Sequence, residues 1–137
     1  MSVYVDTSAA AKLLVEEPES PALADHLDAF VANDVPLVSS LLLETEFRRV
    51  AVREGLEQTR VSDLISRFDL YEPSRSLFHE AGILPGAGPR TPDALRLATA
   101  LRVGVTTVMT YDVRQAAAAR ELGLLAEHPG RDLARKA

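Results

Sequence analysis

The sequence lacks several residue types, and each absence excludes a class of protein. Its 137 residues include no cysteine and no tryptophan, and aromatic residues make up only 5%. Without cysteine there are no disulfides, zinc–thiolate sites or thiol catalysis, which fits a reducing compartment. No apolar run approaches the roughly 18 residues of a membrane span, and no basic segment precedes the first apolar residues. We therefore expect a cytoplasmic protein that does not contact membranes.

A basic surface of large extent is also absent. Fifteen lysine and arginine residues against twenty acidic residues give a net charge of −5. Net charge describes solubility and long-range attraction, and it leaves room for a local basic rim around an acidic site. With 47% hydrophobic and 26% charged residues, the chain has the composition of an ordinary globular protein. Its length predicts a single domain over residues 1–137.

The hydrophobic pattern predicts short strands that alternate with helices. Strands are expected at 3–5, 36–39 and 105–111, with further edge strands at 70–73 and 124–126. Helices are expected at 7–14, from Ser20 to about 31, at 40–55, around 61–68, and at 74–83, 91–102 and 113–122. This alternation is typical of an α/β fold, in which helices cover both faces of a parallel sheet.

Two aspartates lie where such a fold binds ligands, and a third lies at the start of a predicted helix. Asp6 and Asp112 each follow directly after a predicted strand, and the carboxyl ends of parallel strands meet at one edge of the sheet. Asp93 lies in the first turn of the helix that begins at Thr91. Each of them alone has an ordinary explanation, because aspartate caps helices, forms turns and offsets the helix dipole.

Glu46 is the most informative acid. At about 100° per residue it lies roughly 60° from the centre of the inward face of its predicted helix. The residues that form this face are Leu43, Phe47, Val50 and Ala51. A carboxylate on a core-facing flank needs a cation or a hydrogen-bond network, because an isolated buried charge is costly. A salt bridge to a buried arginine and a functional role both satisfy that need.

Taken together, these four acids predict a cation site. Two carboxylates about 4 Å apart repel by about 4 kcal/mol at an effective dielectric constant of 20, so protons or a cation must neutralise the cluster. Oxygen ligands without cysteine or paired histidines favour Mg²⁺ or Mn²⁺ over zinc. Ser8 and Thr110 would bring hydroxyl groups to the same edge, although capping and strand packing explain both equally well. The three histidines, His26, His79 and His128, have no ligand spacing.

Four segments resemble the motifs of a PIN domain, and more closely those of VapC toxins of bacterial type II toxin–antitoxin pairs. They are 3–9 (VYVDTSA), 39–46 (SSLLLETE), 91–100 (TPDALRLATA) and 110–114 (TYDVR). The motifs occur in the order and at the spacing of that family, over nearly the whole chain. The resemblance implies an α/β/α sandwich with a short parallel sheet. It also implies a Mg²⁺- or Mn²⁺-dependent endoribonuclease that forms a homodimer and is silenced by a VapB-like antitoxin.

The resemblance also assigns roles to individual residues. The four acids of the family match Asp6, Glu46, Asp93 and Asp112, which are the expected catalytic residues. Asp6, Asp93 and Asp112 would hold the metal, directly or through water, and Glu46 would be an outer ligand or a base. The small hydroxyl after the first aspartate corresponds to Ser8. Many relatives carry histidine three residues after the third acid, where this chain has Arg96.

Three arginines are candidates for contacts with RNA phosphates. They are Arg75, Arg90 and Arg114, although each taken singly is more typical of a solvated surface. Arg90 ends the glycine-rich loop 84–90, and this loop could reach over an elongated ligand.

Two other functions remain open at this point. A phosphoaspartyl phosphatase would use Asp6 as nucleophile, but it needs a second acid two residues later, where Ser8 stands. A catalytically weak PIN-like or receiver-like binding module is the other alternative. A receiver needs adjacent acids after the first strand and a lysine after the last, whereas this chain has no lysine between Lys12 and Lys136.

Overall fold

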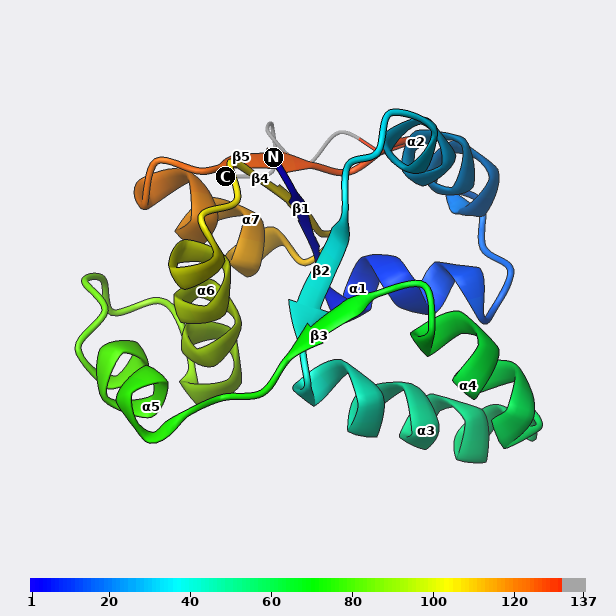
Figure 1. Cartoon of the computed structure of the whole chain (residues 1–137), viewed down its shortest axis with the longest axis horizontal. Coiled ribbons are helices and arrows are strands. Elements are labelled where there is room, and N and C mark those ends of the chain that lie inside the picture. Colours follow the sequence, from blue (N-terminus) through cyan, green and yellow to red (C-terminus); the bar gives the residue numbers. More distant parts are fainter. Residues whose placement is uncertain (132–137) are drawn as a thin grey trace.

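The computed structural model describes residues 1–131, and its centre is a five-stranded parallel sheet (Figure 1). The strand order is β3-β2-β1-β4-β5. The strands are β1 Val3–Val5, β2 Leu37–Ser40, β3 Asp69–Tyr71, β4 Thr107–Met109 and β5 Leu125–Glu127. Every neighbouring pair in this sheet is parallel, so each connection must cross over the sheet, and helices make the crossovers. The predicted α/β class is confirmed.

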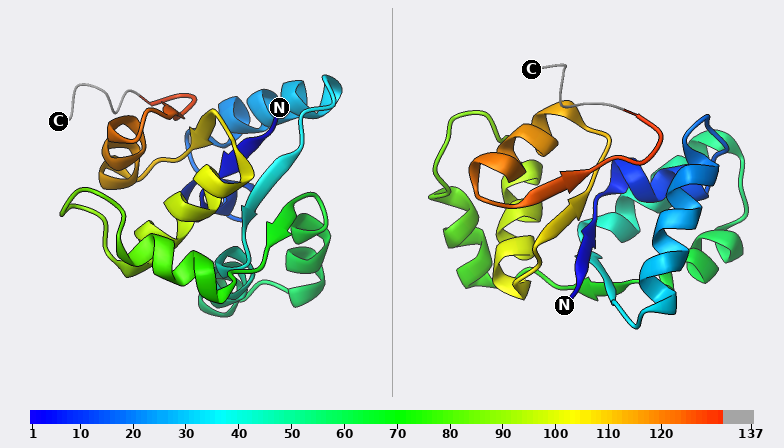
Figure 2. Two further views of the ribbon diagram at one scale, coloured as in Figure 1. Left: turned by 60° about the vertical axis from the view of Figure 1, so that its left-hand side comes forward. Right: turned by 90° about the horizontal axis from the view of Figure 1, so that it is seen from above.

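The helices form two layers, one on each side of the sheet. They are α1 Thr7–Ala10 with the 3₁₀ turn Ala11–Leu13, α2 Ser20–Ala32, α3 Leu42–Glu54, α4 Gln58–Ile65, α5 Arg75–Gly82, α6 Thr91–Val103 and α7 Val113–Glu121. The right-hand view of Figure 2 shows α5, α6 and α7 on one side and α1 to α4 on the other. The predicted α/β/α sandwich is therefore confirmed. No helix within residues 1–131 has the length and apolarity to cross a membrane.

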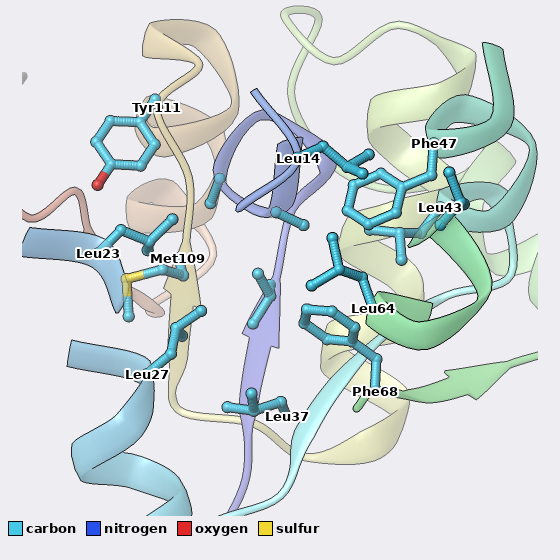
Figure 3. Packing of buried hydrophobic residues seen from close by; sticks show 14 of the residues in the cluster. Leu14, Leu23, Leu27, Leu37, Leu43, Phe47, Leu64, Phe68, Met109 and Tyr111 are labelled. Carbon is cyan, nitrogen blue, oxygen red and sulfur yellow. The ribbon is translucent and has the colours of Figure 1, made fainter. Parts of the chain in front are cut away.

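The sheet separates two hydrophobic cores. Successive side chains of a strand point to opposite faces, so Val3 and Val5 of β1 enter one core and Tyr4 enters the other. The first core lies against α1 to α4, where Leu43, Phe47, Leu64 and Phe68 pack together (Figure 3). The second core is formed with α6 and α7. Because both faces are covered, the central strands β1 and β4 are buried along their whole length, which is typical of a parallel sheet.

Several element boundaries differ from those predicted. The run 105–111 was expected to be one strand, but β4 spans only Thr107–Met109, because its neighbour β1 offers three residues for pairing. The expected helix 7–14 is divided into α1 and a 3₁₀ turn. Helices expected to start at a serine or threonine cap mostly include that residue, as Ser20 and Thr91 show. Ser74 does cap α5, since its Oγ accepts a hydrogen bond from the Leu77 N–H at 3.2 Å.

The fold brings four chain segments to the carboxyl edge of the sheet. Strands β1, β2 and β4 end there, and the helices that follow them, α1, α3 and α7, begin there. The first turn of α6 lies at the same edge, because Arg96 of this helix contacts the residue that ends β1. This edge is where ligands bind in open α/β sheets.

Candidate active site

Asp6 is held at the end of β1 by backbone and side-chain hydrogen bonds. Its N–H donates to the Met109 carbonyl at 2.9 Å, and only 4% of the residue is exposed. Oδ2 accepts hydrogen bonds from Ser8 Oγ at 2.7 Å and Thr110 Oγ1 at 2.8 Å. The other oxygen, Oδ1, is buried and has no hydrogen-bond partner among residues 1–131. The two hydroxyls therefore fix the carboxylate and leave one oxygen open to a further ligand.

Arg96 fills the space between three of the four acids. Its Nε lies 3.6 Å from Asp6 Oδ1, and its Nη1 donates to Asp93 Oδ1 at 3.2 Å. Its Nη2 contacts Glu46 Oε2. The Arg96 side chain is only 12% exposed. One guanidinium thus joins carboxylates that come from the end of β1, from α3 and from α6.

Glu46 lies at the outer rim of this cluster. Its side chain is 35% exposed, whereas those of Asp6 and Asp93 are 5% and 10% exposed. Glu46 Oε1 accepts a hydrogen bond from Thr7 Oγ1 at 2.7 Å, so both of its oxygens have partners. The position of Glu46 agrees with its predicted place on the flank of the inward face of the helix. The salt bridge to an arginine, which was one of the two predicted explanations, is present as the pair with Arg96.

Asp93 is fixed at the start of α6. Its Oδ2 accepts a hydrogen bond from the Arg90 backbone N–H at 3.3 Å, so the carboxylate caps its own helix while facing Arg96. Arg114, from the start of α7, lies with its Nη2 3.9 Å from the same oxygen. Asp93 therefore combines the helix-stabilising role that its position predicts with membership of the acid cluster.

Asp112 is linked to the cluster through hydroxyl and arginine neighbours. It caps α7, with Oδ1 accepting from the N–H groups of Arg114 and Gln115 at 2.9 and 3.2 Å. Its own N–H donates to Thr110 Oγ1 at 3.1 Å, and this hydroxyl is bonded to Asp6. Of the four predicted acids, three thus meet on Arg96, and Asp112 stands beside them as a helix cap.

The three candidate phosphate-binding arginines have different surroundings. Arg90 and Arg114 are exposed and lie next to Asp93, at the rim of the cluster. Arg75 begins α5, whose first turn contacts Arg102 through Ser74 and Ser76. Arg102 is at the opposite end of α6 from Asp93, so Arg75 lies far from the acids. Of the histidines, His26 lies outside the cluster, 3.4 Å from Glu127.

Tyr4 lies in the strand that ends at Asp6. Its ring is buried, and its hydroxyl oxygen accepts a hydrogen bond from the Ser40 N–H at 3.3 Å. Burial, and after it the negative charge of Asp6, raises the pKa of Tyr4 well above its usual value. This phenol therefore stays neutral at physiological pH and provides structural support to the site.

The donor chemistry of the cluster fits a hard divalent cation. Its candidate ligand atoms are carboxylate and hydroxyl oxygens, and the buried Asp6 Oδ1 lacks a hydrogen bond to the described part of the chain. Three carboxylates around one guanidinium leave an excess of negative charge that a further cation would offset. In the part of the chain that the structure describes, no three acidic or histidine side chains are already arranged to hold a metal. The guanidinium occupies the centre of the carboxylates instead.

A second ionic cluster, centred on a buried lysine, was not predicted from the sequence. We call it the Lys12 cluster, and its members are Lys12, Glu17, Glu19, Arg131 and Tyr111. Lys12 Nζ lies 3.0 Å from Glu17 and 2.9 Å from Glu19, and its side chain is only 4% exposed. Arg131 donates to Glu19 at 2.7 Å, and both cations lie over the Tyr111 ring. Because Tyr111 stands between Thr110 and Asp112, this cluster braces the loop that carries part of the site.

Comparison with known proteins defines the class of this protein. The PIN domain family matches residues 3–121, so the chain belongs to that family. Among its relatives is ribonuclease VapC35 of Mycobacterium tuberculosis, which is 37% identical over 136 residues, covering 93% of this chain and 97% of that protein.

Solved structures share the fold. VapC20 of M. tuberculosis, described as a sarcin–ricin loop cleaving toxin, has a TM-score of 0.69 at 17% identity, covering 93% of this chain and 100% of that one. VapBC2 of Rickettsia felis, bound to a DNA fragment from its promoter, has a TM-score of 0.69 at 15% identity. The match covers 94% of this chain and 99% of that one.

Proposed function

We propose that this chain, acting as one domain over residues 1–137, is the toxin of a type II toxin–antitoxin pair and hydrolyses RNA phosphodiester bonds with the help of a divalent metal. The PIN fold and the 37% identity to ribonuclease VapC35 support this function. The observation that carries it is the meeting of Asp6, Glu46 and Asp93, which are far apart in sequence, at the carboxyl edge of the sheet.

Asp6, Asp93 and Asp112 are the residues that would hold Mg²⁺ or Mn²⁺. A carboxylate-bound cation of this kind activates water and stabilises the negative charge that develops on a phosphodiester. Ser8 and Thr110 keep Asp6 in one orientation, with Oδ1 directed to the cluster. The site is thus oriented before substrate arrives, which reduces the cost of reorganisation during the reaction.

Glu46 and the rim arginines would act on the RNA side of the site. Glu46 is the most exposed acid of the cluster, and Thr7 holds its carboxylate in place, so it is positioned to accept a proton from the attacking water. Arg90 and Arg114 are exposed residues next to Asp93, where their guanidinium groups would contact phosphate oxygens.

The direct test is a cleavage assay with purified protein and labelled RNA. We expect cleavage with Mg²⁺ or Mn²⁺, none with EDTA, and loss of cleavage in Asp6→Asn. Asp63→Asn is the matched control, because Asp63 is an exposed aspartate on α4, away from the acid cluster. Equal cleavage in EDTA, or by the Asp6→Asn protein, would contradict the proposed mechanism.

An antitoxin partner and a homodimer belong to the same proposal. A groove beside α2 is lined by apolar side chains that a small VapB-like protein could cover, namely those of Leu13, Leu27, Val31, Leu37 and Phe68. Co-expression with the adjacent reading frame, followed by size-exclusion chromatography, tests the partner and the dimer together. Persistent failure to isolate a complex, or a monomeric elution volume, would remove the corresponding part of the proposal.

A catalytically weak binding module is the second candidate, and one observation favours it. Arg96 already joins three of the acids that a metal would need. The two functions are separated by mutating the acids. If Asp6→Asn leaves both toxicity in cells and partner binding unchanged, the binding module is the better description.

A further inference from the structure

Arg96 makes a contact with a different carboxylate through each of its three guanidinium nitrogens. Nε faces Asp6, Nη1 faces Asp93 and Nη2 faces Glu46. A guanidinium stays protonated in proteins, so the side chain acts as a fixed positive charge at the centre of the acids. It lies between three carboxylates, a position that would otherwise attract a metal ion.

The contacts of Arg96 are uneven. The contact to Asp93 is within hydrogen-bond distance at 3.2 Å, whereas Nε and Asp6 Oδ1 are 3.6 Å apart and neither atom has a hydrogen bond among residues 1–131. The innermost carboxylate is therefore the one that the guanidinium satisfies least. Three acids around one cation also leave net negative charge, which Arg114 offsets only from the exposed rim, at 3.9 Å.

We propose that Arg96 is an internal counter-cation that must leave Asp6 and Asp93 before a divalent ion binds there, so that this residue sets the metal affinity of the protein. This inference rests on the metal site of the proposed function. Two like charges would repel each other strongly at the centre of the cluster. The geometries also differ, because Mg²⁺ requires oxygen atoms at about 2.0–2.1 Å, while the guanidinium holds the carboxylates farther apart.

The exposure of the acids indicates the direction in which the guanidinium moves. Glu46 is 35% exposed and lies at the rim, whereas Asp6 and Asp93 are the buried pair. Arg96 can turn outwards and keep its contact with Glu46 while it releases the other two carboxylates. In that arrangement Glu46 remains the partner of Arg96, and Asp6 and Asp93 become free to bind the ion.

The test compares Arg96→Gln with Arg102→Gln. Arg102 is on the same helix and pairs with Glu80 outside the site, which makes it a matched control. We expect Arg96→Gln to bind Mn²⁺ at least about tenfold more tightly than the wild type by calorimetry, and Arg102→Gln to bind it like the wild type. In EDTA, Arg96→Gln should melt at a lower temperature than the wild type, and saturating Mn²⁺ should raise its melting temperature by the larger amount. Equal or weaker Mn²⁺ binding by Arg96→Gln overturns the proposal.

A measurement on the unmodified protein covers the case in which Arg96→Gln does not fold. The Nε–H group of Arg96 gives its own signal in a ¹⁵N NMR spectrum. We expect Mg²⁺ to shift this signal and to increase its exchange with water, while the Nε–H signal of Arg102 stays in place. An unchanged Arg96 signal at saturating Mg²⁺ contradicts displacement.

These measurements separate a failure of the Arg96 displacement from a failure of the ribonuclease function. If the wild type cleaves no RNA but Arg96→Gln binds Mn²⁺ more tightly, the ribonuclease function fails and the displacement of Arg96 stands. If the wild type cleaves RNA with Mg²⁺ and Arg96→Gln shows unchanged Mn²⁺ affinity, the displacement fails and the ribonuclease function stands.

Discussion

Two ionic clusters within residues 1–131, each centred on a cation with little exposure, differ in their balance of charge. In the Lys12 cluster, the cations Lys12 and Arg131 face Glu17 and Glu19. In the cluster around Arg96, one guanidinium faces three carboxylates, and Asp6 Oδ1 has no hydrogen bond within residues 1–131. The two clusters meet at residues 110–112, because Tyr111 packs against Lys12 while Thr110 binds Asp6.

This difference separates a structural cluster from a functional one. The balanced cluster has no spare capacity for a ligand and fixes the position of the site loop. The unbalanced cluster is less favourable for folding, because its carboxylates repel each other, but it retains affinity for a further cation. Loss of a cation from the first cluster should therefore affect stability, and loss of an acid from the second should affect cleavage.

The largest expected effect is the loss of activity in Asp6→Asn. Removing a carboxylate that holds the metal takes away several kcal/mol of transition-state stabilisation, so cleavage should fall by about 10³-fold or more. Its stability in EDTA should equal or exceed that of the wild type, because one repelling charge is removed. Single-turnover cleavage and urea unfolding measure the two properties. A clear loss of stability in EDTA would show that this cluster is structural after all.

The next effect is the loss of stability in Lys12→Met. The Lys12 side chain is 4% exposed, and its removal takes one of two cations from the nearly buried Glu19 and the charge from above the Tyr111 ring. We expect the free energy of unfolding to fall by about 3 kcal/mol, as when one partner of a buried ion pair is removed. Cleavage per folded molecule at low temperature should stay near the wild-type value. A stable Lys12→Met protein with impaired cleavage would reverse the roles that we assign to the two clusters.

A smaller effect is expected from acid. Hydrogen bonds from Lys12, and then from Arg131, lower the pKa of Glu19 from 4.5 to about 2. Because the pKa is lower in the folded state, Glu19 stabilises the protein fully above about pH 4.5, and this contribution is lost as the pH falls towards 2. The stability difference between wild type and Glu19→Gln, measured by urea unfolding, should therefore shrink over this range. A difference that does not change with pH would contradict the pairing.

The smallest effect is expected from an ion pair at the surface. Arg102 and Glu80 join α6 to α5 with side chains that are 39% and 50% exposed. Such exposed pairs contribute about 0–1 kcal/mol, so Arg102→Gln should leave the unfolding midpoint almost unchanged and should not alter cleavage. A loss comparable to that of Lys12→Met would show that burial is not what distinguishes the ionic clusters.

Much of the fold could be predicted from the sequence because its elements are marked locally. The apolar run Val3–Val5 before Asp6, the proline after Thr91 and the glycine after Val103 each define an element boundary within a few residues. The length of β4 could not be predicted in this way. The run 105–111 is β-prone throughout, but the extent of a strand depends on its neighbours, and within this run Thr107–Met109 are the residues that pair with β1.

The acids of the site could be placed for a different reason. The rule that parallel strands end at one edge locates Asp6 and Asp112 without knowledge of any contact, and helical geometry puts Glu46 on the inner flank. Neither argument positions Arg96, because two of its three contacts are to Glu46 and Asp6, which lie 50 and 90 residues before it in the chain. The Lys12 cluster gave no local signal, because Glu19 and Arg131 are separated by 112 residues.

A crystal structure of the wild type soaked in Mn²⁺ tests the central claim most directly. The anomalous signal of manganese would locate the ion without ambiguity. We predict Mn²⁺ at the carboxyl edge of the sheet, within about 2.0–2.2 Å of oxygen atoms of Asp6 and Asp93, with the Arg96 guanidinium turned outwards to Glu46. Manganese bound only elsewhere, with Arg96 still between the three carboxylates, would contradict the claim that this acid cluster is a metal site.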